Sequence, residues 1–268
     1  MQKKHVESFY SREKLDSKYD SPYGKTFRDY RTIFEFNKKD YERLDEECKS
    51  INISWFSTVQ DIPSLIEMLY WDLPIYKVAS CNSQNIELLK EMERLIPLEK
   101  EIVISVAGKT ISEISKTISI FKNHKLNILH CVAEYPCKIS NCKLGNIPIL
   151  KKEFESDRIK IGYSGHEEGI TASLKAIDLG AAMVERHFCL SRNSFAHHIE
   201  CSLTPIEFKE MVNIGKSEEK IKNYFQKNKL DKRATNSGFY MSESEKKFLL
   251  NNNYNHQNQI RKNESLFH

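Results

Sequence analysis

The sequence lacks a long hydrophobic run and lacks the common signatures of nucleotide and serine-hydrolase sites. No apolar stretch approaches the roughly 20 residues that a membrane-spanning helix needs, and none follows the opening Met1-Gln2-Lys3-Lys4-His5. The mean hydropathy of −0.56 is typical of a soluble protein. There is no P-loop, no GxGxxG turn and no nucleophile elbow. We therefore expect a cytoplasmic protein with no membrane partner, built around a different kind of site.

Strong charge of one sign is also absent. The chain carries 41 Lys and Arg against 37 Asp and Glu, a formal net charge of +4 over 268 residues. Basic residues alternate with acidic ones along the helical stretches, as on solvated helix faces. This balance predicts no nucleic-acid partner, although a mild positive charge can help to attract an anionic substrate.

Cysteines are present, but not in a pattern that binds zinc or predicts disulfides. There are seven of them, an odd number, and no CxxC pair occurs. Several lie in apolar runs, as Cys131 does in Ile-Leu-His-Cys-Val. We interpret them as reduced thiols of a cytoplasmic protein.

What the sequence does contain is a regular alternation of short apolar runs with amphipathic stretches. Strands are predicted at Ser54–Val59, Ile75–Ala79, Ile102–Ala107, Asn127–Val132, Ile159–Ser164 and Met183–Leu190. Helices are predicted at Tyr41–Ser50, Ile62–Tyr70, Asn85–Leu95, Ser112–Asn123, Gly169–Leu179 and Pro205–Ile214. Runs that are apolar on both faces favour buried parallel strands. The alternation indicates an α/β fold, either an open doubly wound sheet or a closed barrel.

The chain divides into three parts. Residues 1–36 are expected to form an aromatic-rich N-terminal loop, and residues 37–216 form the α/β body. Residues 217–268 are rich in Lys, Asn and Ser, and we expect a helix there that fades into a polar, disordered tail.

Candidate site residues lie where strands end, the usual place for chemistry in parallel α/β folds. His166 and His187 come at or near the ends of two neighbouring strands. Two such imidazoles can bind one divalent metal, with water or substrate oxygens completing its shell. The alternative is that each histidine is a hydrogen-bonded structural residue.

The other strand ends carry groups that suit an anion. Lys77 lies within an apolar strand, where a lysine is costly without an anionic partner. A phosphate would satisfy it, and so would a buried carboxylate. The hydroxyls of Thr58, Ser80 and Ser105 could join it. Glu134 and Tyr135 end another strand before Pro136.

These segments resemble the N-acetylneuraminate (sialic acid) synthase family, which includes the legionaminic and pseudaminic acid synthases. The matching segments are Ser21-Pro22-Tyr23-Gly24, Phe56-Ser57-Thr58, Pro74 to Ser80, His130 to Pro136, Gly162 to His166, Glu185 to Phe188 and Cys201 to Pro205. The resemblance covers about residues 1 to 215. It implies a TIM-type (β/α) barrel lacking about its first two strands, because we count about six of the eight strand–helix units.

The resemblance also implies an activity. Family members are transferases that condense phosphoenolpyruvate with an N-acetylated hexose, such as N-acetylmannosamine, and release phosphate. By this likeness His166 and His187 bind Mn²⁺ or Mg²⁺, and Tyr135 and Glu134 act at the reacting sugar. The implied substrate-binding residues are Thr58, Lys77, Ser80, Asn82, Ser105 and Ser164. A homodimer is a further expectation, since family enzymes are typically dimers.

Some positions depart from the family pattern. Asn82 stands where an acidic residue is usual, Gly165 replaces an aspartate, and Ala196-His197-His198 replaces a Gly-Pro-Asp-like turn. No segment matches the family's first strand or its antifreeze-like domain.

Two hypotheses stay open: an active nonulosonic acid synthase, or a truncated or degenerate non-catalytic homologue acting as a binding or partner subunit. Another phosphoenolpyruvate aldol-type barrel synthase fits the fold, but not the Glu-Tyr-Pro and Ser-x-His segments.

Overall fold

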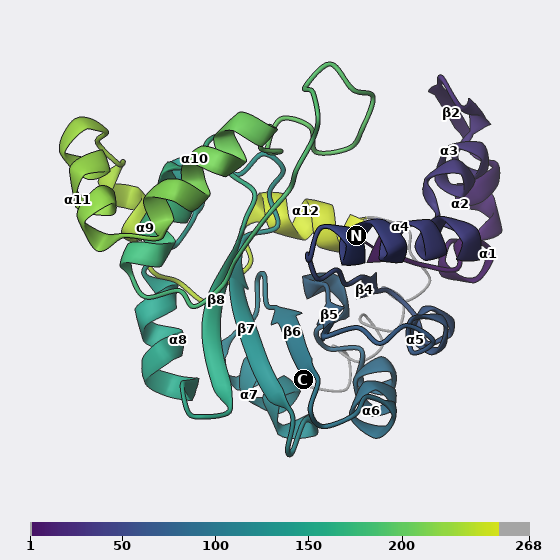
Figure 1. Cartoon of the computed structure of the whole chain (residues 1–268), viewed down its shortest axis with the longest axis horizontal. Coiled ribbons are helices and arrows are strands. Elements are labelled where there is room, and N and C mark those ends of the chain that lie inside the picture. The colour runs from purple at the N-terminus through teal and green to yellow at the C-terminus, as the bar shows by residue number, and fades with distance from the viewer. Residues whose placement is uncertain (1, 252–268) are drawn as a thin grey trace. The chain divides into compact units, whose positions relative to one another are not determined.

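A computed structural model describes residues 2–251 of the chain, drawn as a ribbon in Figure 1. It divides into two compact units, each considered by itself. The first comprises residues 1–103 and 117–125, with the chain beyond residue 248; the second comprises residues 104–116 and 126–248.

Parallel strands form the framework of both units. The strand order is β1-β4-β5-β6-β7-β8-β9, and strand β6 (Glu101–Ser105) runs from the first unit into the second. The other strands are β1 (Gln2–Lys3), β4 (Thr58–Val59), β5 (Ile75–Val78), β7 (Lys125–Cys131), β8 (Ile159–Gly165) and β9 (Val184–Arg186). The pairs β1–β4, β4–β5, β7–β8 and β8–β9 are all parallel. The predicted parallel α/β class is confirmed. The TIM-type barrel lacking about its first two strands stays a prediction.

In the first unit, helices alternate with the short strands β4 and β5. Helix α4 (Lys38–Ser50) precedes β4, α5 (Ile62–Met68) follows β4, and α6 (Ile86–Leu95) follows β5. Helix α4 begins with a capping box between Asn37 and Asp40. Tyr41, on the buried face of α4, stacks on Trp55 with ring centroids 5.6 Å apart. Aromatic packing therefore anchors α4 close to strand β4.

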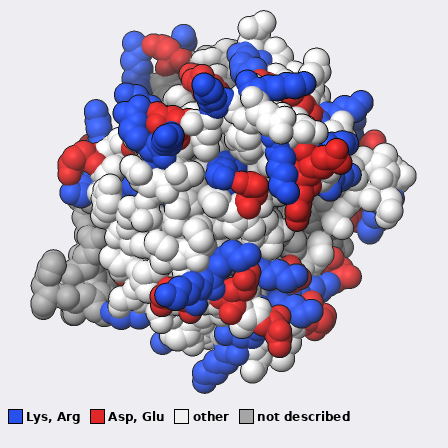
Figure 2. All heavy atoms as spheres, turned by 90° about the vertical axis from the view of Figure 1, so that its left-hand side faces the viewer, with Lys and Arg blue, Asp and Glu red and all other residues white. Residues whose placement is uncertain are grey.

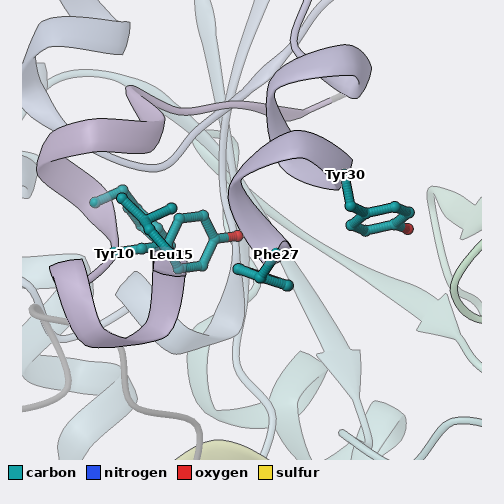
Figure 3. Close-up of a cluster of buried hydrophobic side chains, with 5 residues drawn as sticks. Tyr10, Leu15, Phe27 and Tyr30 are labelled. Carbon is teal, nitrogen blue, oxygen red and sulfur yellow. The ribbon is translucent and has the colours of Figure 1, made fainter. Parts of the chain in front are cut away.

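The N-terminal segment differs from the loop expected for residues 1–36. It contains α1 (Val6–Phe9), α2 (Arg12–Asp16), the hairpin β2 (Lys18–Ser21) and β3 (Gly24–Thr26), and α3 (Phe27–Phe34). Figure 3 shows the reason, a cluster of buried side chains. Its members are Phe9, Tyr10, Leu15, Phe27 and Tyr30. Edge-to-face contacts, such as Tyr10 against Phe27 at 5.1 Å, give this segment a small core of its own.

In the second unit, helices alternate with β7, β8 and β9. Helix α7 (Ile111–Ile120) begins in this unit, which also contains α8 (Asn146–Phe154), α9 (Thr171–Asp178), α10 (Pro205–Gly215) and α11 (Glu218–Lys227). Helix α8 was not predicted; Pro148 lies in its first turn, where a missing N–H costs little. Helices α9 and α10 share a core built from Ile170, Leu174, Leu203 and Met211.

After α11 come a short 3₁₀ helix, η3 (Lys232–Thr235), and α12 (Glu243–Asn251). The sequence predicted one helix fading into a tail over residues 217–268, whereas α11, η3 and α12 all lie in this range; residues 252–268 are outside the described residues. Within residues 2–251, no helix is long and apolar enough to cross a membrane. Figure 2 shows lysines and arginines interspersed with acidic side chains on the face it displays.

The cap of α5 provides a test of the first unit. Asp61 Oδ1 accepts the N–H of Ser64 at 2.8 Å, and Oδ2 accepts the N–H of His5 at 2.9 Å. Asp61→Ala is expected to lower the free energy of unfolding by about 1–2 kcal/mol because both donors lose their acceptor. Asp61→Asn, which keeps one acceptor oxygen, should lose less. Urea unfolding checks this, and an unchanged midpoint for Asp61→Ala would contradict the capping role.

Candidate functional site

The predicted site residues are divided between the two units. Thr58, Lys77, Ser80 and Asn82 belong to the first, whereas Ser105, Glu134, Tyr135, Ser164, His166 and His187 belong to the second. Each set is described within its own unit.

In the first unit, strand pairing brings Thr58 and Lys77 together. They are partners in the parallel register of β4 and β5, and both are buried. Ser80 opens a 3₁₀ turn, η1 (Ser80–Asn82), directly after β5. The strand register therefore places Thr58 and Lys77 side by side in the sheet, with Ser80 shortly after β5 along the chain.

Asn82 belongs to a buried amide network in the same unit. Its Nδ2 donates to Gln60 Oε1 at 2.9 Å and to the Gln60 carbonyl oxygen at 3.1 Å. Gln60 Nε2 in turn donates to Gln2 Oε1 at 3.3 Å. Sequence reasoning did not choose Gln60; its position directly after the short strand β4 was the available signal. These bonds orient the Asn82 side chain.

In the second unit, the two predicted histidines meet around a tyrosine. His166 follows β8 and His187 follows β9, and their ring centroids lie 5.4 Å apart. The Tyr135 ring is 4.1 Å from His166 and 5.8 Å from His187. The structure thus brings Tyr135, His166 and His187 together, and their roles stay a prediction.

A third histidine, His198, joins this group and was not chosen from the sequence. Its ring lies 4.1 Å from Tyr135 and 5.4 Å from His187. Its backbone has a φ of +61°, which is uncommon for a residue other than glycine. Burial, with smaller effects of His187 and His197, lowers the pKa of His198 to about 4. It is therefore neutral near pH 7.

The geometry of His166 fits a metal ligand. Its Nδ1–H donates to the Val132 carbonyl oxygen at 2.7 Å, and since a carbonyl only accepts, Nδ1 carries the proton. Nε2 is then the nitrogen that would face a metal, the arrangement typical of metal-binding histidines. Among residues 2–251, no group of three or more His, Cys, Asp and Glu side chains could hold a metal ion. A metal at this pair would complete its shell with water or substrate oxygens.

A buried ion pair links the residues next to the two histidines. Arg186 Nη1 lies 2.9 Å from Glu167 Oε1, and neither side chain is exposed to solvent. Glu167 also accepts from Tyr163 Oη at 2.9 Å and from Ser173 Oγ at 2.7 Å. Burial, followed by the nearby Glu167 carboxylate, raises the pKa of Tyr163 well above its usual value. The tyrosine therefore stays protonated as a donor.

Arg186 is held from several directions. Its guanidinium also donates to Ser173 Oγ at 3.0 Å, to the Gly169 carbonyl oxygen at 2.6 Å and to the Cys201 carbonyl oxygen at 3.1 Å. It thus joins the end of β9 to the segment after β8 and to the segment before α10. Because Glu167 follows His166 and Arg186 precedes His187, the pair restricts how far the two histidines can separate.

Gly165 is required by this packing. A Cβ at this position would lie 2.5 Å from Glu167 Oε2 and 2.8 Å from Tyr163 Cε1. The space that a larger residue would occupy is filled by the Glu167 carboxylate. The departure from the family's aspartate at this position therefore has a steric reason.

The remaining predicted residues have distinct environments. Ser105 Oγ is buried and has no hydrogen-bond partner within the described part of the chain. Ser164 Oγ donates to Glu185 Oε1 at 2.9 Å, across the β8–β9 pair. The Glu134 carboxylate accepts from Asn141, Ser242 and Ser244. Ser105 is thus the hydroxyl best suited to accept a ligand contact.

Glu134 is held as an anion by these donors. Burial raises its pKa, but hydrogen bonds from Ser244, Asn141 and Ser242 outweigh this effect, so the pKa lies below its usual value. The structure therefore connects Glu134 to the chain's C-terminal region, while Tyr135 contacts the histidines.

The chain is similar to proteins of known family. The model of the NeuB family matches residues 1–227. The chain is 32% identical over 217 residues to N-acetylneuraminate-9-phosphate synthase of Drosophila melanogaster, covering 79% of this chain and 57% of that protein. It is 29% identical over 229 residues to N,N'-diacetyllegionaminic acid synthase of Campylobacter jejuni, covering 78% and 67%. The chain therefore spans a little more than half the length of the Drosophila relative.

A solved structure supports the same relationship. The crystal structure of N-acetylneuraminic acid (sialic acid) synthetase from Leptospira borgpetersenii, in complex with citrate, superposes with a TM-score of 0.65 at 29% identity. It covers 87% of this chain and 72% of that one. With the family model matching most of its length, the chain belongs to the NeuB family.

Proposed function

We propose that this chain catalyses the condensation of phosphoenolpyruvate with an N-acetylated hexose, such as N-acetylmannosamine, to give a nonulosonic acid and phosphate. The observation that carries the proposal is the group formed by Tyr135, His166 and His187 at two neighbouring strand ends of a NeuB-family chain. The sialic and legionaminic acid synthases among its relatives support the substrate class.

The reaction forms one carbon–carbon bond and one carbon–oxygen bond, to water, and breaks the carbon–oxygen bond to phosphate. The enol carbon of phosphoenolpyruvate attacks the open-chain sugar aldehyde, and the aldehyde oxygen takes up a proton. Water then adds to the oxocarbenium carbon, and phosphate leaves. No oxidant or reductant is needed.

In the second unit, His166 and His187 would hold a divalent metal, Mn²⁺ or Mg²⁺. When bound, that ion supplies Lewis-acid polarisation of the sugar aldehyde. Tyr135, in ring contact with both histidines, would orient the sugar beside them. Because His166 Nδ1 binds Val132, Nε2 is the ring nitrogen that would take this role.

The anionic groups of phosphoenolpyruvate require donors. In the first unit, Lys77, Thr58 and Ser80 would bind them, with Asn82 oriented by Gln60. In the second, the Ser105 hydroxyl, which has no hydrogen-bond partner among residues 2–251, would gain one on substrate binding. Ser164 would have to exchange its bond to Glu185 for one to the substrate.

A second candidate is a degenerate homologue that binds ligands or a partner without turnover. Gly165 favours it, because the neighbouring Glu167 leaves no room for the family's aspartate at that position. The two candidates differ in phosphate release.

Metal binding tests the histidine pair. Titration of the wild-type chain with Mn²⁺ is expected to show one site. His187→Ala should weaken it by more than about 100-fold, since even changes outside the ligand shell cost about 10- to 100-fold. His5→Ala, which alters a half-exposed histidine of the first unit, is the control. Equal affinity in wild type and His187→Ala would rule out this site.

Phosphate release tests turnover. With Mn²⁺ present, phosphoenolpyruvate should release phosphate only when an N-acetylated hexose is added. Lys77→Met should lower kcat/KM by about 10²- to 10³-fold, the usual effect of losing one well-placed electrostatic contact. Lys90→Met, on the exposed side of α6, should have no effect. A metal-binding wild type that releases no phosphate with any hexosamine would favour the non-catalytic candidate.

A further inference from the structure

The residues that directly follow strand β7 are hydrogen-bonded to a segment far along the chain. This segment, residues 238–247 of the second unit, includes the start of helix α12 and is called here the C-terminal strap. Figure 1 shows α12 in yellow, at the end of the coloured chain. The strap contacts Ala133 and Glu134, which directly precede Tyr135.

Glu245 is the central residue of the strap. Its side chain is fully buried, which is rare for a glutamate. Oε1 accepts the backbone N–H of Ala133 at 3.1 Å, and Oε2 lies 3.3 Å from Lys143 Nζ. Oε2 also accepts the N–H of Ser242 at 3.0 Å, at the start of α12. One carboxylate thus joins the strand end, a lysine and the strap itself.

Two serines of the strap bind Glu134, the residue that follows Ala133. Ser242 Oγ donates to Glu134 Oε1 at 3.0 Å, and Ser244 Oγ donates to the same oxygen. Asn141 Nδ2 binds the other oxygen at 3.1 Å. Ala133 through its backbone and Glu134 through its side chain are therefore both held by the strap.

Lys143 strengthens the attachment. Its backbone has a φ of +48°, a conformation that non-glycine residues rarely adopt without surrounding support. Its Nζ donates to the Tyr240 carbonyl oxygen at 2.9 Å and lies 4.1 Å from the centre of the Tyr240 ring. Asn146 exchanges two hydrogen bonds with the backbone of Gly238, at 2.8 and 3.1 Å. The start of the strap is thus anchored independently of Glu245.

The segment after Tyr135 is fixed from the opposite direction. The N–H of Cys137 donates to the His166 carbonyl oxygen at 2.8 Å, and Cys137 forms a parallel bridge with Glu167. Tyr135 therefore lies between two anchored stretches, one held by the strap and one held by the residues around His166.

We propose that Glu245 is a positioning residue: through Ala133 and Glu134 the C-terminal strap holds the Tyr135 ring against His166 and His198. This inference deepens the proposed function, because Tyr135 is the residue assigned there to orient the sugar. A purely structural Glu245 would stabilise the fold without affecting where Tyr135 lies.

Ring-current shifts measure that position directly. Tyr135 lies 4.1 Å from both His166 and His198, so it shifts their ring C–H resonances in a protein labelled with ¹³C-histidine. Tyr135→Leu supplies the reference positions without the aromatic ring. The spectra are recorded at one pH without added metal, so neither catalysis nor metal binding is needed.

Glu245→Ala is expected to move both histidine signals more than half of the way to their Tyr135→Leu positions. Glu245→Gln keeps an acceptor oxygen for Ala133 and should move them less. Glu243→Gln is the matched control, since Glu243 is exposed and pairs with Lys246; it should leave the signals in place. Unchanged signals in folded Glu245→Ala would overturn the proposal.

A variant on the strap surface covers the case in which Glu245→Ala does not fold. Ser242→Ala/Ser244→Ala removes both hydroxyl bonds to Glu134 and leaves the buried carboxylate intact. It should move the same signals in the same direction by a smaller amount. A folded double variant with wild-type signals would contradict a positioning strap.

Steady-state kinetics of Glu245→Ala provide a further test, which depends on the proposed function. Glu245→Ala should lower kcat by about 10- to 100-fold, the range expected when a reacting group is misplaced by about 1 Å. KM for phosphoenolpyruvate should change by less than about twofold, since other residues bind that substrate. If the wild type releases no phosphate, the proposed function fails, whereas the histidine spectra still decide the role of Glu245.

Discussion

The arrangement of the second unit depends on one buried ion pair, Glu167 with Arg186. Two charges removed from water are stable only when nearly every polar atom finds a partner. Here the carboxylate accepts from a tyrosine, a serine and the guanidinium, and the guanidinium reaches two carbonyl oxygens beyond it. The adjacent chain positions are His166 and His187. The pair therefore restricts how far the two imidazoles can separate.

This constraint explains why the site combines family features with departures from them. Gly165 has no side chain because the Glu167 carboxylate occupies the space beside it. His198 packs against Tyr135, and its partial burial lowers its pKa to about 4. The result is a compact aromatic and imidazole group with few charges, in which added metal or substrate anions would be the dominant electrostatic influence.

The parts predicted from sequence were those with local signals. Apolar β-branched runs predicted the strands, and strand ends predicted His166, His187 and Tyr135 as neighbours. The observed strands are shorter at several ends, as in β4 and β9, where only a few residues pair. The pattern shows where a chain is extended, whereas the length of a strand depends on its neighbours.

The features that the sequence did not predict are those formed by contacts between residues far apart in the chain. Glu245 lies 112 residues from the backbone N–H it accepts, and no periodicity connects them. The N-terminal aromatics look like a loop in sequence, but they pack edge to face as a small core. His198 lies in an irregular segment with a positive φ, so only the folded backbone brings it to Tyr135.

The measurement that most directly tests the role of the ion pair is a Mn²⁺ titration of Glu167→Gln/Arg186→Met beside the wild type. Replacing both residues leaves no unpaired buried charge, so the double variant should fold. The account predicts one Mn²⁺ site in the wild type and binding weaker by about 10- to 100-fold in the folded variant, because the histidines lose their alignment. Equal affinity in the two proteins would show that the histidines are positioned without this pair and would contradict the account.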